Sequence, residues 1–266
     1  MVQRELNLKI MEVKTSLADL RKLPNSKSNL ETQLLFGERI EVICEKKEGW
    51  IFCKSLTDGY KGWIKKNEVS KKLNEKNFKV SELTTFIYEK PDIKSNFLNK
   101  LHLNSKLQVL KSTNDWSSLY YKNKISFVFN KHISTILEKP KNLNNYVKTA
   151  KKFLNTVYLW GGKSHLGLDC SGLVQLCLEN QGILFPRNTQ DQFHCKILKT
   201  INEDEINYGT LIFWKGHVAI AINKSQIIHA NAYHMKVTIE NLDNAKKRIE
   251  PVYGNVVGYK KLIEEN

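Results

Sequence analysis

Apolar and polar residues alternate in short runs along the first half of the chain, and polar turns separate these runs. The stretch 37–43, Gly-Glu-Arg-Ile-Glu-Val-Ile, has a strand-like alternation, and 104–110, Asn-Ser-Lys-Leu-Gln-Val-Leu, repeats it, starting 67 residues later at 104 instead of 37. Pro24-x-x-Lys-Ser recurs at Pro91 with the same displacement. A repeat of short strands bounded by turn residues predicts two small β-barrels.

Each copy of the repeat also contains a tryptophan that opens a strand. Trp50 and Trp116 are followed by polar turns at 57–59 and 122–123, and a second apolar strand closes each unit. The segment Gly-Tyr-Lys-Gly-Trp-Ile at 59–64 is similar to the signature of bacterial SH3-like domains. We therefore expect SH3-like barrels over residues 1–72 and 73–137. The second copy lacks the Gly-x-Gly-Trp element, so we expect it to be structural.

The hydrophobic period changes after the repeat. The segment 138–145, Glu-Lys-Pro-Lys-Asn-Leu-Asn-Asn, indicates a linker, because proline and asparagine break regular structure. Apolar residues then recur at helical spacing, and the apolar run 173–178 predicts a buried helix that stops at Gly182. Runs at 210–214, 217–222 and 226–230 predict strands. Residues 138–266 are thus expected to form an α+β domain.

Composition excludes several protein classes. A chain of 266 residues with 41% hydrophobic side chains can bury sizeable cores, which argues against disorder. The longest apolar runs, Leu211–Trp214 and Val218–Ile222, are strand-sized and far below the roughly 18 residues of a membrane span, so no membrane partner is expected. The first residues lack the apolar centre of a secretory signal, and this pattern predicts a cytoplasmic location.

Cysteine usage and charge refine this picture. The five cysteines are odd in number and irregularly spaced, which fits a reducing compartment and predicts neither a disulfide framework nor a metal site. The formal charge of +15 should favour acidic substrates. Because the lysines are scattered, mostly as pairs, the pattern favours a generally basic composition over a nucleic-acid face. The sequence implies no cofactor and carries no signal for an oligomeric state.

Candidate chemistry begins with a glycine-rich loop at 161–167, which leads into Asp169-Cys170-Ser171-Gly172 at the start of the predicted buried helix. The unsatisfied amides and macrodipole at a helix N-terminus favour a thiolate over a thiol, so Cys170 is the candidate nucleophile. The other four cysteines lie in strand-like, apolar or aromatic segments, and we expect them to be small buried hydrophobes. They are Cys44, Cys53, Cys177 and Cys195.

A nucleophilic cysteine requires a base and a group that orients the base. If the turn between the strands 217–222 and 226–230 comprises the three residues 223–225, residue 222 faces 226. His217 is then the diagonal neighbour of His229 on one face, ~7–8 Å away by backbone. A two- or four-residue turn would place them on opposite faces. The remaining histidines form no spaced cluster typical of a metal site.

These motifs resemble those of the NlpC family of bacterial papain-like cell-wall peptidases. The matching segments are Tyr-x-Trp-Gly-Gly at 158–162, Asp-Cys-Ser-Gly-Leu-Val-Gln at 169–175, Pro-Arg at 186–187, Gly-Thr-Leu-Ile-Phe-Trp at 209–214, Gly-His-Val-Ala-Ile at 216–220 and Ile-His-Ala at 228–230. The resemblance implies a papain-like domain with Cys170 as nucleophile, His217 as base and His229 as the third, polar member. It also implies that Tyr158 lies beside the oxyanion site and that Trp160 contacts substrate.

The chain departs from the family pattern at Thr210, where aspartate is usual, and in a Lys-Ser-His insertion at 163–165. The barrels resemble the subgroup that cleaves γ-D-glutamyl–diamino acid bonds. That likeness implies that Glu38, Tyr60 and Asp169 bind the α-amine of L-alanine and that Ser171 contacts the D-glutamate carboxylate. The expected activity is hydrolysis of L-Ala-γ-D-Glu-diaminopimelate, a murein-derived peptide with a free N-terminus, during cell-wall peptide recycling.

Two other functions fit the same patterns. One is an amidase or acyltransferase with the same fold that acts on another amide or ester. The other is a non-catalytic module whose barrels bind cell-wall or other anionic polymer. The complete set of Cys170, His217 and His229 argues against an inert domain.

Overall fold

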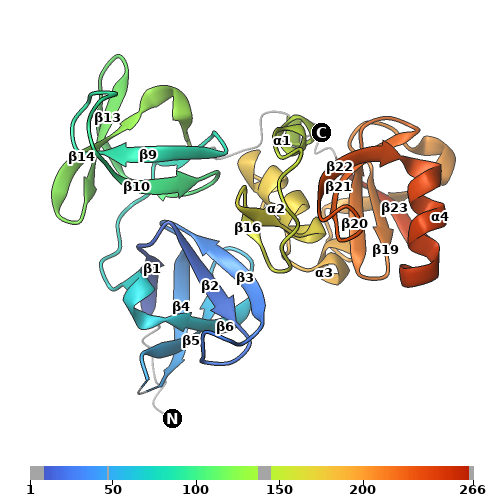
Figure 1. Cartoon of the computed structure of the whole chain (residues 1–266), viewed down its shortest axis with the longest axis horizontal. Coiled ribbons are helices and arrows are strands. Elements are labelled where there is room, and N and C mark those ends of the chain that lie inside the picture. Colours follow the sequence, from blue (N-terminus) through green and yellow to red (C-terminus); the bar gives the residue numbers. More distant parts are fainter. Residues whose placement is uncertain (1–8, 47, 137–144, 264–266) are drawn as a thin grey trace, which may run out of the picture. The chain divides into compact units, whose positions relative to one another are not determined.

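The computed structural model describes residues 9–46, 48–136 and 145–263 (Figure 1). The chain divides into two compact units, with the division after Thr135, and each is described by itself. The boundary predicted between residues 137 and 138 lies outside the described residues.

The first barrel is a single antiparallel sheet. Alternation places Ala18 and Leu20 in its core, whereas Asp19 and Arg21 face outward and form an ion pair 2.5 Å long. A short 3-10 helix, η1 (Lys66–Glu68), connects its last two strands. In sheet order, the strands are β3 (Leu30–Leu35), β2 (Leu17–Arg21), β6 (Lys61–Lys65), β5 (Trp50–Ser55), β4 (Arg39–Glu45), β1 (Ile10–Val13) and β7 (Val69–Ser70).

The second barrel reproduces the first with one difference. Its β9 (Thr84–Tyr88) and β10 (Phe97–His102) begin 67 residues after the starts of β2 and β3 at 17 and 30. The strand expected over 104–110 is divided into β11 (Lys106–Leu107) and β12 (Val109–Ser112). Beside the break, the Asn77 side chain accepts a hydrogen bond of 2.8 Å from the amide of Val109 and donates one of 2.9 Å to its carbonyl. The turn predicted at 122–123 has two left-handed residues, with φ of 49° and 63°, as tight hairpins require.

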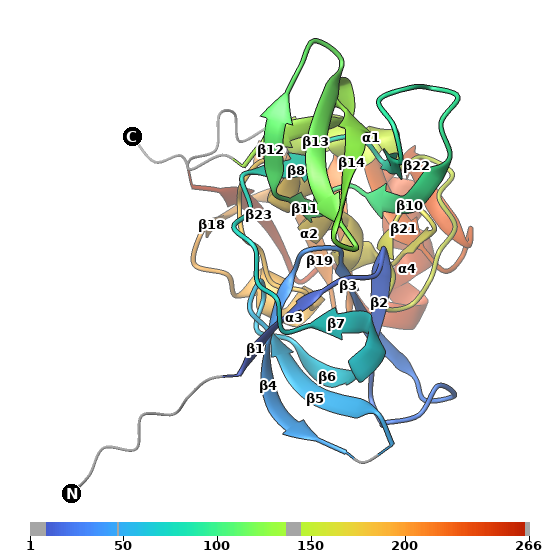
Figure 2. The same cartoon turned by 90° about the vertical axis from the view of Figure 1, so that its left-hand side faces the viewer.

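The strands of this barrel form a five-stranded and a three-stranded antiparallel sheet, and Figure 2 shows β12, β13 and β14 side by side. The first sheet comprises β10 (Phe97–His102), β9 (Thr84–Tyr88), β14 (Lys124–Phe129), β13 (Trp116–Tyr121) and β12 (Val109–Ser112). The second comprises β11 (Lys106–Leu107), β8 (Phe78–Val80) and β15 (Ile133–Thr135).

The C-terminal unit has the predicted α+β architecture. Its helices are α1 (Tyr146–Lys152), α2 (Cys170–Asn180), α3 (Thr189–Phe193) and α4 (Leu242–Tyr253), and a small hairpin, β16 (Lys163–Ser164) with β17 (Gly167–Leu168), precedes α2. The antiparallel sheet has the order β18 (Leu198–Ile201), β23 (Gly258–Leu262), β19 (Leu211–Trp214), β20 (His217–Ala221), β21 (Gln226–Asn231) and β22 (Lys236–Asn241).

Helices cover this sheet on both faces, which is why β20 is buried along its whole length. Leu242, Ala245 and Ile249 of α4 pack over a core that includes Ile212 and Ala219. The alternate residues of the same strands point to the opposite face, and α2 contacts β20 and β21. Among the described residues, no helix is both long and apolar enough to cross a bilayer.

Candidate active site

Cys170 is the first residue of α2, as predicted, and only 7% of it is exposed. Asp169 caps the helix, because its Oδ1 accepts a hydrogen bond of 2.7 Å from the amide of Gly172. The helix ends at Asn180, and Gly182 follows it with a φ of +84°, so the predicted glycine stop is confirmed. These local signals place the thiol at a helix N-terminus.

The glycine-rich loop packs directly against this helix start. A Cβ on Gly172 would lie 2.5 Å from the carbonyl oxygen of Gly162, closer than any real Cβ contact. The amide of Gly161 donates to Asp169 Oδ2 at 2.9 Å. Glycine is therefore required at position 172 for the loop and the helix to approach so closely.

Asp169 is also held by Arg187, a buried residue to which the sequence assigned no role. Arg187 Nη1 donates to Asp169 Oδ1 at 2.9 Å, and Nη2 donates to Oδ2 at 2.7 Å. Arg187 Nη1 also donates to Ser171 Oγ at 2.8 Å. With the amides of Gly161 and Gly172 and the hydroxyl of Ser171, which donates to Oδ1 at 3.3 Å, Asp169 accepts five hydrogen bonds, so the roughly four lone-pair sites of its carboxylate are all occupied. An ammonium group approaching Asp169 would have to share an oxygen with these donors.

The two histidines meet as the hairpin argument predicts. Ile220 pairs with Ile228 and Ala221 with Ile227, so the turn comprises residues 223–225. His217 Nε2 lies 2.8 Å from His229 Nδ1, and the ring centroids are 5.0 Å apart. The predicted register and the shared face are confirmed.

Two further charged residues extend the line of hydrogen bonds beyond His229, and neither of them was identified from the sequence. His229 Nε2 lies 2.6 Å from Glu240 Oε1 on β22. Arg248 on α4 donates through Nη2 to the same carboxylate oxygen. His229 pairs with Thr238, so Glu240 is its diagonal neighbour on the same face of the sheet. No strand was predicted from the sequence over residues 236–241, so this contact was missed, whereas Arg248 is brought in by the packing of α4.

Cys170 and His217 both line a cavity of about 250 Å³. Its wall also includes Tyr158, Trp160, Tyr233 and Arg248. The Tyr253 ring stacks on the imidazole of His217 with a centroid distance of 6.0 Å, and Cys170 Sγ lies 3.9 Å from Thr189 Oγ1. The cavity thus gathers the predicted nucleophile and base with two of the predicted substrate contacts.

Burial determines the protonation of the reacting groups. It raises the pKa of the Cys170 thiol to about 11, with a smaller contribution from the Asp169 charge. Burial also lowers the pKa of His217 well below its ordinary value, and His229 and Arg248 add to this effect. Desolvation thus opposes the thiolate that a helix N-terminus favours, while hydrogen bonds at Cys170, including one from its own helix start, act in the opposite direction. Both groups are neutral near pH 7.

Tyr158 is placed by hydrogen bonds from two directions. Its amide donates to the carbonyl of Met235 at 2.8 Å, and it forms an isolated bridge with Leu168. Burial, with the nearby Cys170 and Asp169, raises the pKa of the phenol. The hydroxyl therefore stays protonated and can donate to developing negative charge in the cavity.

The predicted barrel residues lie in the N-terminal unit. Glu38 is buried, not a solvated charge, and its Oε2 accepts a hydrogen bond of 2.8 Å from the amide of Leu35. The hydroxyl of Tyr60 donates to Glu31 Oε2 at 2.9 Å. Glu31, which sequence reasoning did not single out, is thus an acid in contact with Tyr60. The role of Glu38 and Tyr60 in substrate binding stays a prediction.

The remaining cysteines are free and differ in exposure. Cys53 and Cys177 are buried, as expected, and Cys195 is partly buried. Cys44 is exposed because β4 runs beyond the barrel core at its end, so the burial predicted for it is wrong. Within the described ranges, no three His, Cys, Asp or Glu side chains gather in a way that could hold a metal ion.

Comparison with known protein families identifies the domains. The NlpC/P60 family model matches residues 155–250, which include Cys170, His217 and His229. The chain carries an NlpC/P60 cysteine-peptidase domain. A model of the bacterial dipeptidyl-peptidase SH3 domain matches residues 20–69. The predicted family and enzyme class are confirmed.

Two curated relatives match this chain over most of its length. Dipeptidyl-peptidase 6 of Lysinibacillus sphaericus is 24% identical over 244 residues, which are 85% of this chain and 89% of that protein. The gamma-D-glutamyl-L-lysine dipeptidyl-peptidase of Bacillus subtilis (strain 168) is 28% identical over 228 residues, 76% of this chain and 72% of that protein.

A solved structure has the same fold. An NlpC/P60 family protein from Bacillus cereus ATCC 10987 superimposes with a TM-score of 0.82 at 21% sequence identity, and the match covers 96% of this chain and all of that one. The α+β papain-like fold with strand-rich N-terminal domains is therefore confirmed.

Proposed function

We propose that this protein hydrolyses the bond between γ-D-glutamate and an L-diamino acid, meso-diaminopimelate or L-lysine, in murein peptides with a free N-terminus. The observation that carries the proposal is the presence in one chain of the NlpC/P60 domain and the dipeptidyl-peptidase SH3 domain. The similarity to gamma-D-glutamyl-L-lysine dipeptidyl-peptidases, which extends beyond the peptidase domain, supports it. Such peptides arise from cell-wall turnover, so the proposal includes a role in their recycling.

In this proposal, Cys170 attacks the carbonyl carbon of the γ-glutamyl amide. Because the thiol is neutral, its proton passes to His217 as the carbon–sulfur bond forms. His217 Nε2 is engaged by His229, which leaves Nδ1 as the atom that accepts this proton. The imidazolium then protonates the departing amine, and a thioester remains.

Water completes the reaction. His217, neutral again, takes a proton from water, and the resulting hydroxide attacks the thioester carbonyl. The carbon–sulfur bond breaks, and the thiol regains the proton from His217. In both steps the protonated phenol of Tyr158 is positioned near Cys170 to stabilise charge on the carbonyl oxygen.

We further propose that the N-terminal barrel recognises the free α-amine of the substrate. Tyr60 with an acidic partner would supply this contact, and Glu38 is the acid that the family resemblance implies. Glu31 is a second candidate, because its carboxylate already accepts a hydrogen bond from Tyr60. Ser171, held by Arg187, would contact the D-glutamate carboxylate. A cytosolic place of action goes with this proposal, and the free state of the five cysteines supports it.

Mass spectrometry of reaction products tests the function. L-Ala-γ-D-Glu-diaminopimelate and its L-lysine counterpart should be cleaved well, whereas the N-acetylated forms should be cleaved poorly, because an unpaired buried acid costs on the order of 1–3 kcal/mol. Tyr60→Phe, Glu38→Ala and Glu31→Gln are measured separately. Substitution of a residue that binds the amine should reduce the difference in cleavage rate between the free and the N-acetylated peptides. Comparable rates on free and blocked peptides, or equally efficient release from intact sacculi, would contradict the proposal.

A further inference from the structure

A continuous line of hydrogen bonds connects the candidate base to helix α4. It runs from His217 Nε2 to His229 Nδ1, 2.8 Å, and from His229 Nε2 to Glu240 Oε1, 2.6 Å. Arg248 then donates to the same oxygen of Glu240. The line therefore crosses the neighbouring strands β20, β21 and β22 and ends on the helix that covers them.

The charges at the far end determine where every proton in the line sits. Glu240 is held as a carboxylate, because hydrogen bonds and charge from His229 and Arg248 lower its pKa. A carboxylate only accepts, so His229 must carry its proton on Nε2 and present a bare Nδ1 to His217. His217 must then carry its proton on Nε2, which leaves Nδ1 bare. That is the tautomer a base facing Cys170 needs.

We propose that Glu240 is a positioning residue that fixes the tautomer of His229 and, through it, of His217, and that Arg248 anchors Glu240. The inference deepens the proposed function, because it concerns the base of the same peptidase site. A carboxylate that holds a catalytic imidazole in one tautomer usually bonds it directly. Here a second imidazole lies between them.

Arg248 has a second contact that favours this role. Its guanidinium lies over the ring of Tyr233, 4.5 Å from the centroid, and 23% of its side chain is exposed. Held between an aromatic face and a carboxylate, the guanidinium has little freedom to rotate. The position of Glu240 is therefore determined by α4 as well as by β22.

Glu240 and Arg248 affect the histidines in opposite directions. His229 faces Glu240, which raises its pKa, and Arg248 and His234, which lower it. His217 faces His229 and Arg248, which lower its pKa, and also the Tyr253 ring and the Cys170 thiol across the cavity. Removing the carboxylate should move protonation of the histidine pair to lower pH, and removing the guanidinium should move it to higher pH.

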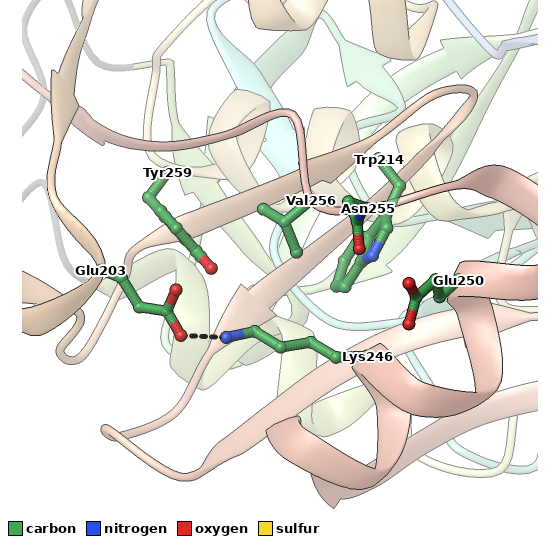
Figure 3. A pocket seen from close by; sticks show the side chains of 7 residues that line it. All are labelled: Glu203, Trp214, Lys246, Glu250, Asn255, Val256 and Tyr259. Carbon is green, nitrogen blue, oxygen red and sulfur yellow. Dashed lines mark hydrogen bonds and ion pairs between the residues drawn. The ribbon is translucent and has the colours of Figure 1, made fainter.

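The same helix provides a matched control. On its other side, Lys246 of α4 forms an ion pair with Glu203, beside Tyr259 at the edge of a separate depression (Figure 3). Glu203→Gln removes the charge from one ion pair of α4, as Glu240→Gln does, but this ion pair does not contact a histidine. A general loosening of α4 should affect both variants alike.

The experiment measures the rate of Cys170 alkylation by iodoacetamide between pH 5 and 9 in the full-length protein, with the labelled peptide quantified by mass spectrometry. Glu240→Gln should slow alkylation at pH 7 by about tenfold or more, since general-base assistance is typically worth 10²–10⁴ and only the tautomer is disturbed. The low-pH part of its rate profile, where protonation of the histidines slows alkylation (the acidic limb), should move to lower pH. Glu240→Asp should recover part of the rate. Arg248→Met should move the limb to higher pH, and Arg248→Lys should move it less.

A second readout reports the tautomer directly. In protein with ¹⁵N-labelled histidine, His229 should carry its proton on Nε2 in the wild type and populate the Nδ1–H form in Glu240→Gln. The inference is overturned if Glu203→Gln slows alkylation as much as Glu240→Gln does. It is also overturned if Glu240→Gln and Arg248→Met shift the low-pH part of the rate profile in the same direction, or if the tautomer of His229 does not change in Glu240→Gln. Should Glu240→Gln fail to fold, the Arg248 variants decide. The inference is then overturned unless Arg248→Met moves the low-pH part of the rate profile to higher pH and Arg248→Lys moves it less.

Alkylation needs no substrate, so this result is independent of which peptide is cleaved. The kcat and KM for L-Ala-γ-D-Glu-L-Lys complete the test: a positioning role predicts a lower kcat with KM unchanged within about threefold. If alkylation follows the expected pattern but the tripeptide is not cleaved, the proposed substrate is wrong and the positioning role stands.

Discussion

Cys170 and His217 share one cavity, and burial shifts the pKa of each in the direction that favours its neutral form. The nucleophile must then be generated during the attack itself. His217→Ala should lower kcat/KM by about 10²–10⁴, since a general base is worth that much. Cys170→Ala should remove activity while the protein stays folded.

His229→Ala should cost less than His217→Ala, because an unpositioned imidazole still adopts the productive orientation part of the time. Steady-state hydrolysis of the tripeptide, with thermal melting as the folding control, checks this order. An enzyme that needs His229 but tolerates loss of His217 would reverse the roles.

The buried histidines also make stability depend on pH. Burial lowers the pKa of His217 and His229 below the ordinary value of 6.5, so below about that pH the unfolded chain binds more protons than the folded one. Their contribution to the free energy of unfolding is complete above this value and is lost as the pH falls through the folded-state pKa. Urea denaturation between pH 5 and 8 should show the decline, and His217→Gln should flatten it. Identical slopes for both proteins would contradict the assignment.

At the scale of elements, the contact between the glycine-rich loop and the start of α2 holds the nucleophile in place. Alanine normally stabilises a helix over glycine by about 1 kcal/mol. At position 172, however, the new Cβ would lie 2.5 Å from a backbone oxygen, and overpacking of this kind costs about 1–3 kcal/mol. Gly172→Ala should lower the melting temperature and the rate of Cys170 alkylation. A higher melting temperature would show that the loop can move aside.

For the whole molecule, the separation into two units allows their roles to be tested apart. The C-terminal unit has its own core between the sheet and α4. Residues 136–266 expressed alone should therefore melt cooperatively, as followed by circular dichroism, and should keep pH-dependent alkylation of Cys170. If the barrel binds the substrate amine, this unit should cleave free and N-acetylated tripeptides at similar rates. Retained preference for the free peptide would exclude the barrel from recognition.

Features that depend on residues close together in the chain could be predicted from the sequence alone. Alternation and turn residues predicted the repeated strands, Asp169 and the glycines predicted the start of α2, and the three-residue turn placed His217 and His229 on one face. The side chains that complete the site, and the burial that shifts the pKa values of Cys170 and His217, became evident only in the folded chain. Arg187 and Arg248 reach the site through long-range packing, which no local period marks, and Glu240 lies on β22, a strand that the sequence did not predict. The burial that keeps Cys170 protonated exists only once helices cover both faces of the sheet.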